Sequence, residues 1–199
     1  ILARRQRQMC IRDRHIFAPM PQLKITLLGA PNVEVNNARC DIQRRKVMAM
    51  LAYLTVTRQP QRRDRLVGLL WPESGQKAAR ASLRRELHAL TQILGVGWLI
   101  ANRYTIELNP DADIWSDVEK FRHSVANVMD GREASVDDLT TAVDLYQDDF
   151  MAGFSLSDCP EFDDWQFFEA DELRRLYGSA LESLIANYES REAYEVAIG

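Results

Sequence analysis

One stretch of this sequence concentrates cationic side chains at helical spacing. Between residues 76 and 94, apolar residues recur in steps of three or four and form one helical stripe: Ala79, Leu83, Leu87, Leu90 and Leu94. At 100° per residue the opposite side carries Lys77, Ala81, Arg84, Arg85, His88 and Gln92, with Arg80 and Thr91 at one edge and Ser82 at the other. Solvated helix faces normally mix acids with bases, whereas Glu86 is the one acid in this stretch. The pattern therefore favours contact with DNA over a merely solvated face.

Charge is unevenly distributed along the whole chain, with a basic first half and an acidic second half. The 199 residues have a net charge of −4. Residues 1–109 contain 19 Lys and Arg against 7 Asp and Glu, and residues 110–199 contain 6 against 22. A basic half indicates a polyanionic partner, and an acidic half indicates a solvated or protein-binding surface. The turn at 109–111 (Asn-Pro-Asp) is the predicted boundary between two domains.

Composition excludes several classes of protein. With 46% hydrophobic and 27% charged residues, the chain is typical of soluble globular proteins. The longest uncharged apolar run, 47–56, has about half of the length of a membrane span, so no membrane partner is expected. Cys10, Cys40 and Cys159 are too far apart for a Cys-x-x-Cys zinc site and odd in number for a disulfide framework. The expected location is the reducing cytoplasm, in association with the nucleoid.

No pattern in the sequence indicates catalysis. His15, His88 and His123 have no metal-ligand spacing, and the glycines at 95 and 97 lack the strand–turn–helix context of a nucleotide loop. The acids at 161, 163 and 164 lie where a helix N-terminus favours negative charge. We therefore expect no enzyme activity, no catalytic residue, no metal and no cofactor.

The elements around the cationic helix can be predicted from periodicity and turns. Strands are expected at 23–27, 33–35 and 40–42, helices at 44–57, 64–70 and 76–94, and a hairpin at 98–101 and 104–108. The hairpin turn is expected at Asn102-Arg103, with Asn102 at a positive φ. A sheet, three helices and a hairpin in this order predict an α+β winged helix-turn-helix over 20–109. In such domains the third helix enters the major groove of DNA.

The first nineteen residues are set apart from this fold. They have no clean periodicity, and Met20 directly precedes the first predicted strand. We expect translation to start at Met20 and residues 1–19 to be a non-native or disordered extension. The alternative is a basic arm that lies in a groove of DNA.

The acidic half, 110–199, is predicted to be helical. Apolar residues follow helical spacing over 115–125 and again over 136–146. A third helix is expected from about Pro160 to residue 187 or 188, and a further helix from about Arg191. The helix that begins near Pro160 carries an aromatic stripe formed by Phe162, Trp165, Phe168 and Leu176. We interpret this stripe as core, and the alternative is a groove that binds a partner.

Several segments together resemble one family of bacterial regulators. The segments are 23–29 (LKITLLG), 45–54 (RKVMAMLAYL), 69–73 (LLWPE), 81–87 (ASLRREL), 108–113 (LNPDAD), 149–154 (DFMAGF) and 161–165 (EFDDW). Residues 22–199 thereby resemble the SARP/BTAD transcriptional activators, whose DNA-binding domain is an OmpR-type winged helix. The resemblance implies that 110–199 are the N-terminal part of a bacterial transcriptional activator domain, an all-α array similar to tetratricopeptide (TPR) repeats and incomplete at the C-terminus. Ser82 stands where members often have Asn, and Ala89, Thr91 and Gln92 where they have further Arg, so fewer phosphate contacts are expected there.

The family resemblance also implies a function. It is that of an activator that binds direct repeats near a promoter and recruits RNA polymerase, with double-stranded DNA as partner and homodimerisation or regulatory contacts through the acidic half. The expected DNA-binding residues are Lys77, Arg80, Arg84, Arg85, His88 and Arg103. The alternative is a signalling scaffold whose winged helix and helical repeats bind protein partners. Salt-dependent DNA binding distinguishes the two hypotheses.

Overall fold

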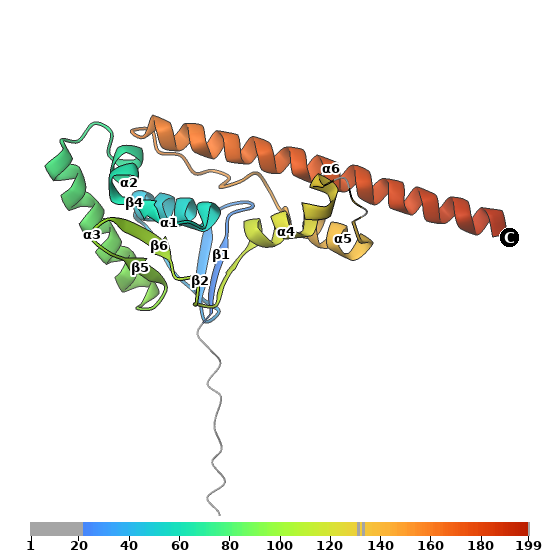
Figure 1. Cartoon of the computed structure of the whole chain (residues 1–199), viewed down its shortest axis with the longest axis horizontal. Coiled ribbons are helices and arrows are strands. Elements are labelled where there is room, and N and C mark those ends of the chain that lie inside the picture. Colours follow the sequence, from blue (N-terminus) through green and yellow to red (C-terminus); the bar gives the residue numbers. More distant parts are fainter. Residues whose placement is uncertain (1–21, 131, 133, 199) are drawn as a thin grey trace, which may run out of the picture.

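A computed structural model describes residues 22–130, 132 and 134–198 of the chain. Residues 1–19, interpreted above as an extension, lie outside the described residues. The described part is a mixed α/β fold with six helices and two small sheets (Figure 1). A sheet, three helices and a hairpin follow one another in the predicted order.

The N-terminal sheet has the strand order β3-β2-β1-β7. Strand β1 (Leu23–Thr26) pairs antiparallel with β2 (Asn32–Val35), which pairs with β3 (Ala38–Arg39). The third strand was predicted at 40–42 and lies two residues earlier. The reason is the two-residue turn at Asn36 and Asn37, both at positive φ (52° and 64°), which lets Val35 pair directly with Ala38.

The strand β7 (Ile114–Ser116) corrects the prediction of a helix through Trp115. It pairs parallel with β1, Leu23 opposite Ile114, and the N–H of Leu23 donates to the carbonyl of Asp113 (3.0 Å). Residues 114–116 thus satisfy the free edge of β1, and helix α4 (Asp117–Met129) begins only after them.

Three helices form the centre of the basic half. They are α1 (Arg45–Thr57), α2 (Arg63–Leu70) and α3 (Gln76–Leu94), within one residue of their predicted starts. Helix α1 is buried from residue 47 to residue 55, so the other elements pack around it. Four residues of the predicted α3 stripe are buried, whereas Leu87 is only half-buried.

The hairpin of β5 (Leu99–Ala101) and β6 (Thr105–Leu108) is joined by a short third strand, β4 (Gln61–Arg62). The N–H of Asn102 donates to the carbonyl of Thr105 (3.0 Å), which makes Arg103 and Tyr104 the central turn residues instead of Asn102 and Arg103. None of these residues has a positive φ. The side chain of Asn102 instead accepts the N–H groups of Tyr104 (2.7 Å) and Thr105 (2.9 Å) and closes the turn.

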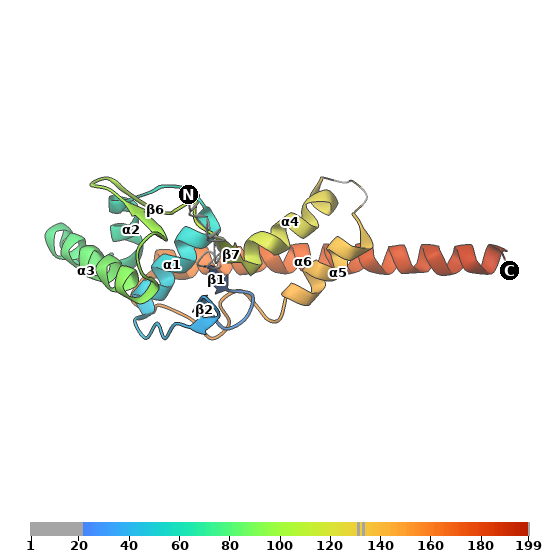
Figure 2. The same ribbon diagram turned by 90° about the horizontal axis from the view of Figure 1, so that it is seen from below.

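The acidic half contains α4, α5 (Val136–Leu145) and α6 (Pro160–Ile198). The predicted new helix near Arg191 is a continuation of α6, because residues 187–191 contain neither Gly nor Pro to interrupt it. Helix α6 runs along α1 and α2 and then along α4 and α5, and its C-terminal part extends past α5 (Figures 1 and 2). None of the described helices combines the length and the apolar composition that a membrane-spanning segment requires.

The two halves share one hydrophobic core. The ring of Tyr53 in α1 packs edge-on against Trp165 in α6, with 4.9 Å between centroids. The N–H of Met151 donates to the carbonyl of Leu27 (2.7 Å). The carboxylate of Asp117 accepts the N–H groups of Leu27 and Leu28 (2.7 and 2.8 Å) at the end of β1. The predicted boundary at 109/110 therefore lies before β7, which completes the N-terminal sheet, and before α4, whose Asp117 binds the end of β1.

Candidate nucleic-acid interface

A cleft of about 1380 Å³ separates α3 from the hairpin and the start of α2. Its floor includes the apolar side chains Leu83 and Leu87 of α3. Its charged lining consists of one carboxylate, Asp64, and five arginines: Arg62, Arg63, Arg80, Arg84 and Arg103. Guanidinium groups present several N–H donors in a plane and bind phosphate oxygens well. The cleft is thus a concentrated cationic surface.

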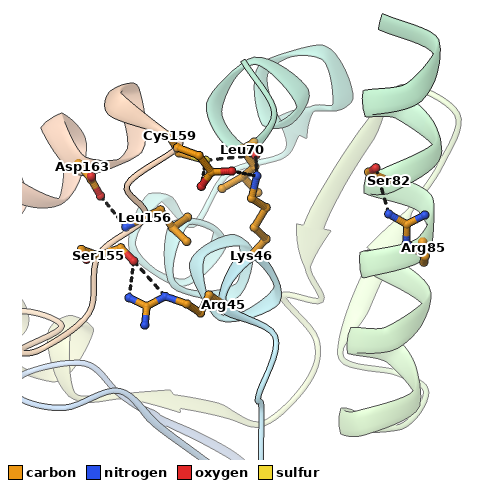
Figure 3. A network of polar contacts seen from close by, with 10 residues as sticks. Arg45, Lys46, Leu70, Ser82, Arg85, Ser155, Leu156, Cys159 and Asp163 are labelled. Atoms are coloured by element: carbon orange, nitrogen blue, oxygen red, sulfur yellow. Dashed lines mark hydrogen bonds and ion pairs between the residues drawn. The ribbon is translucent and has the colours of Figure 1, made fainter. Parts of the chain in front are cut away.

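Four of the six predicted DNA-binding residues line this cleft: Arg80, Arg84, His88 and Arg103. The other two, Lys77 and Arg85, are exposed on α3 but lie outside the lining. Arg85 donates to the hydroxyl of Ser82 on the same helix (3.1 Å; Figure 3). The structure thus divides the predicted set into a group that lines the cleft and a pair that does not.

Glu86 is held away from the cleft by an ion pair. The carboxylate of Glu86 lies 3.1 Å from the guanidinium of Arg44, next to the start of α1, and its side chain is only 13% exposed. A second contact, 3.6 Å, reaches Arg85. Glu86, the one acid of α3, is therefore neutralised by Arg44 and Arg85, and the cleft side of the helix stays cationic.

Arg63 is a cleft residue that the sequence analysis missed. Its backbone N–H donates to the carbonyl of Tyr104 (2.8 Å), and its Nε donates to the carbonyl of Asn102 (2.7 Å). Burial, and then the nearby charge of Arg84, lower the pKa of Arg63. Arg63 thus ties the start of α2 to the turn of the hairpin.

Arg62 and Tyr104 were missed for the same reason as Arg63. The pairing of β4 with β6, Arg62 opposite Thr105, brings the start of α2 beside the hairpin turn, and such a non-local pairing is not visible in local periodicity. The available signal was the charge cluster at 61–65 (QRRDR). At the turn, the guanidinium of Arg103 lies 4.5 Å from the ring centroid of Tyr104, a cation–π contact that leaves Tyr104 63% exposed.

Asp64 occupies part of the cationic surface. Its Oδ1 lies 2.9 Å from one terminal nitrogen of Arg80 and 3.3 Å from Nε. Both side chains are about half exposed, at 51% for Arg80 and 63% for Asp64. This pair links the start of α2 with α3 at the mouth of the cleft, where an incoming anion would compete with the carboxylate for Arg80.

Among the described residues, no three His, Cys, Asp or Glu residues lie close enough to hold a metal ion. Burial raises the pKa of Tyr146 to about 12 and that of Cys159 to about 11, so both keep their protons near neutral pH. The Sγ of Cys159 points at the carbonyl of Leu70 (3.2 Å), in the contact between α2 and the start of α6 (Figure 3).

Comparisons with known proteins give a likeness of fold. No family model matches the chain, and no curated protein matches it. Among solved structures, EmbR of Mycobacterium tuberculosis in complex with a low-affinity phosphopeptide has a TM-score of 0.66 and 22% sequence identity. The likeness covers 86% of this chain and 48% of that chain, so this chain spans about half of the length of EmbR. The two proteins share a fold over that length.

Proposed function

We propose that this chain is a sequence-specific DNA-binding transcription regulator of the SARP/BTAD type. The observation that carries the proposal is the cleft between α3 and the hairpin, where five arginines and His88 face one carboxylate. Phosphate contacts supply most of the affinity of such proteins, and side chains on a helix in the major groove read the bases. The likeness in fold to EmbR and the family resemblance of 22–199 support the same assignment.

The proposed division of labour follows the geometry. Helix α3 acts as the recognition helix of a winged helix-turn-helix, and the β5–β6 hairpin acts as the wing. Arg80, Arg84 and His88 contact DNA from α3, Arg103 from the hairpin, and Lys77 and Arg85 contact DNA from positions on α3 outside the cleft lining. Arg62 and Arg63 join this set because they line the same cleft.

The finer assignments rest on the family resemblance. They are activation from direct repeats near a promoter, recruitment of RNA polymerase, dimerisation or regulatory contacts through the TPR-like acidic half, and a place in the cytoplasm at the nucleoid. The domain division at 109/110 belongs to the same proposal, with β7 completing the N-terminal sheet and Asp117 of α4 bound to its end.

Binding of the full chain to duplex DNA tests the proposal. Fluorescence anisotropy over a series of salt concentrations is expected to give an affinity that falls as salt rises. Arg84→Ala should weaken binding to every duplex and reduce the log–log salt slope by about one if Arg84 holds phosphate. If Arg84 is bidentate to guanine, discrimination at one base pair should fall by about 1–3 kcal/mol in a binding-site selection.

Arg175→Ala is the matched control for Arg84→Ala. Arg175 lies on α6, is 73% exposed and pairs with Asp171 within its own helix, so its removal changes the net charge equally without touching the cleft. Equal affinities of the two variants would move the DNA-binding surface away from α3.

The second candidate function is that of a signalling scaffold. EmbR was solved with a phosphopeptide bound, and an arginine-lined cleft also suits a phosphorylated protein segment. Short phosphothreonine peptides in the same anisotropy assay separate the candidates. Peptide binding that Arg84→Ala abolishes, together with no salt-dependent DNA binding, would favour the scaffold.

A further inference from the structure

A long segment of the acidic half carries only negative charge. Residues 133–173 contain thirteen Asp and Glu and no Lys, Arg or His. In the described structure, six of these carboxylates pair with cations: Asp149, Asp158, Glu161, Glu169, Asp171 and Glu172. Among the described residues, ion pairs thus leave part of this charge without a cation.

Two large aromatic side chains lie exposed in the same segment. Phe167 and Phe168 of α6 are 66% and 68% exposed, and their rings contact each other edge-on with 5.8 Å between centroids. The stripe of α6 that faces the core contains Phe162, which is fully buried, and Trp165. The interpretation of the aromatic stripe as core thus holds for Phe162 and is wrong for Phe168, because this part of α6 is covered on one side only.

A small pocket adjoins Phe167. It has a volume of about 440 Å³ and lies between α6 and the segment 148–155. Apolar wall residues include Phe167 and Ala170, and Asp148 and Asp163 contribute carboxylates. Neither of these two aspartates pairs with a cation in the described structure, and the same is true of Asp164, one helical turn before Phe168.

The wall of this pocket also contains a buried acceptor. The Nε2 of Gln166 donates to the carbonyl of Phe154 (2.9 Å), whereas its Oε1 is buried and has no hydrogen-bond partner among the described residues. Buried polar atoms are rarely left without a partner, but this oxygen is closed to solvent, so the exposed side chains beside the pocket, and not this oxygen, offer contacts to an incoming segment.

We propose that this acidic–aromatic patch, formed by Phe167, Phe168, Asp148, Asp163 and Asp164, docks a protein segment in which Lys or Arg stands next to apolar side chains. Aromatic faces attract cations and apolar stems, and the carboxylates bind the charged ends. The same carboxylates repel nucleic acid and anionic lipid surfaces, which disfavours those partners.

The patch is separate from the arginine-lined cleft between α3 and the hairpin. Figure 1 shows α1 between α6 and the strands β5 and β6, so α6 and the hairpin lie on different sides of the basic half. A basic segment can therefore occupy the patch whether or not DNA is bound. The proposal goes beyond the proposed function and does not depend on it.

Peptide binding to the full chain tests the docking site. The probes are three fluorescent peptides of equal length: lysine with leucine, lysine with serine, and glutamate with leucine. The lysine–leucine peptide should bind, and the other two should bind about tenfold more weakly or not at all, since each lacks one of the two recognised features.

Two pairs of matched variants locate the binding. Phe167→Ser with Phe168→Ser should weaken lysine–leucine binding by about tenfold. The control, Ile185→Ser with Tyr188→Ser, changes two exposed apolar residues farther along α6 and should leave binding unchanged. Asp148→Asn with Asp164→Asn should weaken binding and reduce its salt dependence, whereas Asp137→Asn with Asp144→Asn on α5 should not.

Three results would overturn the inference. They are equal affinities of the phenylalanine variant and its control when both keep the melting temperature of the wild type, equal binding of the glutamate–leucine peptide, and a wild-type dimer in sedimentation that the phenylalanine variant abolishes. The last result would assign the patch to a second copy of the chain.

Discussion

At the scale of single residues, Asp64 is expected to limit the affinity of the cationic cleft for phosphate. It is the one carboxylate among the arginines of the lining, and it pairs with Arg80 at 2.9 Å. Half-exposed ion pairs contribute little to stability, about 0–1 kcal/mol, so this pair matters more for what it does to an incoming phosphate. The carboxylate repels phosphate and also occupies the donors of Arg80.

Asp64→Asn is therefore expected to strengthen DNA binding. Release of Arg80 and loss of one negative charge should raise the affinity several-fold and steepen the log–log salt slope by about one. The measurement is anisotropy with the full chain over a salt series. Asp137→Asn, which removes an exposed carboxylate on α5, is the control and should leave the affinity nearly unchanged. Weaker binding by Asp64→Asn would show instead that the carboxylate serves mainly to stabilise the first turn of α2.

At the scale of elements, α3 separates its stability from its binding surface. Leu90 is fully buried, whereas Leu87 is half-buried and lies in the cleft floor. Leu90→Ala should lower the free energy of unfolding by about 2–5 kcal/mol because it opens a core cavity, and Leu87→Ala should lower it less. Urea unfolding of both variants measures the difference. Equal losses would mean that Leu87 is covered as fully as Leu90.

The side chain of Arg63 adds a hydrogen bond to the turn of the hairpin, which β4 already holds by pairing with β6. Arg63→Ala removes the hydrogen bond from Nε to the carbonyl of Asn102 as well as one charge. Arg62→Ala is the matched control, because it removes one charge from the same cleft without a side-chain hydrogen bond to the turn in the described structure. Both variants should bind DNA more weakly, and Arg63→Ala more so.

Amide hydrogen exchange separates the two effects of Arg63. Exchange at residues 102–105 should accelerate in Arg63→Ala and stay at the wild-type rate in Arg62→Ala, because local opening governs exchange. Identical exchange in the two variants would reduce the role of Arg63 to its charge.

At the scale of the whole molecule, Asp117 joins the two halves. It begins α4, yet its carboxylate accepts the N–H groups of Leu27 and Leu28 at the end of β1. Burial raises the pKa of Asp117 above its ordinary value of 3.8, although these hydrogen bonds and that from Val118 oppose the shift. The folded protein therefore holds this proton more tightly than the unfolded chain does.

The raised pKa of Asp117 predicts a pH dependence of stability. The stabilisation from this group is complete below pH 3.8 and is lost as pH rises through the folded pKa. Asp117→Asn does not titrate, so the free energy of unfolding of the wild type minus that of the variant should fall between about pH 4 and pH 7. Denaturant unfolding at both values measures it, with Asp111→Asn, an exposed loop carboxylate, as control. A difference independent of pH would contradict the raised pKa.

The helices, the cationic face of α3 and the hairpin strands could be read from the sequence itself. Periodicity placed α3 at Gln76–Leu94, its observed bounds, because a helix that packs on a core repeats its apolar residues with its own pitch. Arg80, Arg84 and His88, which the helical spacing places away from that stripe, line the cleft, and their contact with DNA stays a prediction. These features are local, and local spacing determines them.

The pairings between distant segments were decided only by the tertiary structure. Strand β7 lies on β1 across about ninety residues of sequence, and β4 brings Arg62 and Arg63 to the hairpin turn. Neither pairing has a local signature, because an edge strand accepts any extended segment that offers its N–H and C=O groups. The exposure of Phe168 was decided in the same way. Helical spacing places it one turn from Trp165, and only the packing of α6 against α1, on one side, determines which of the two is covered.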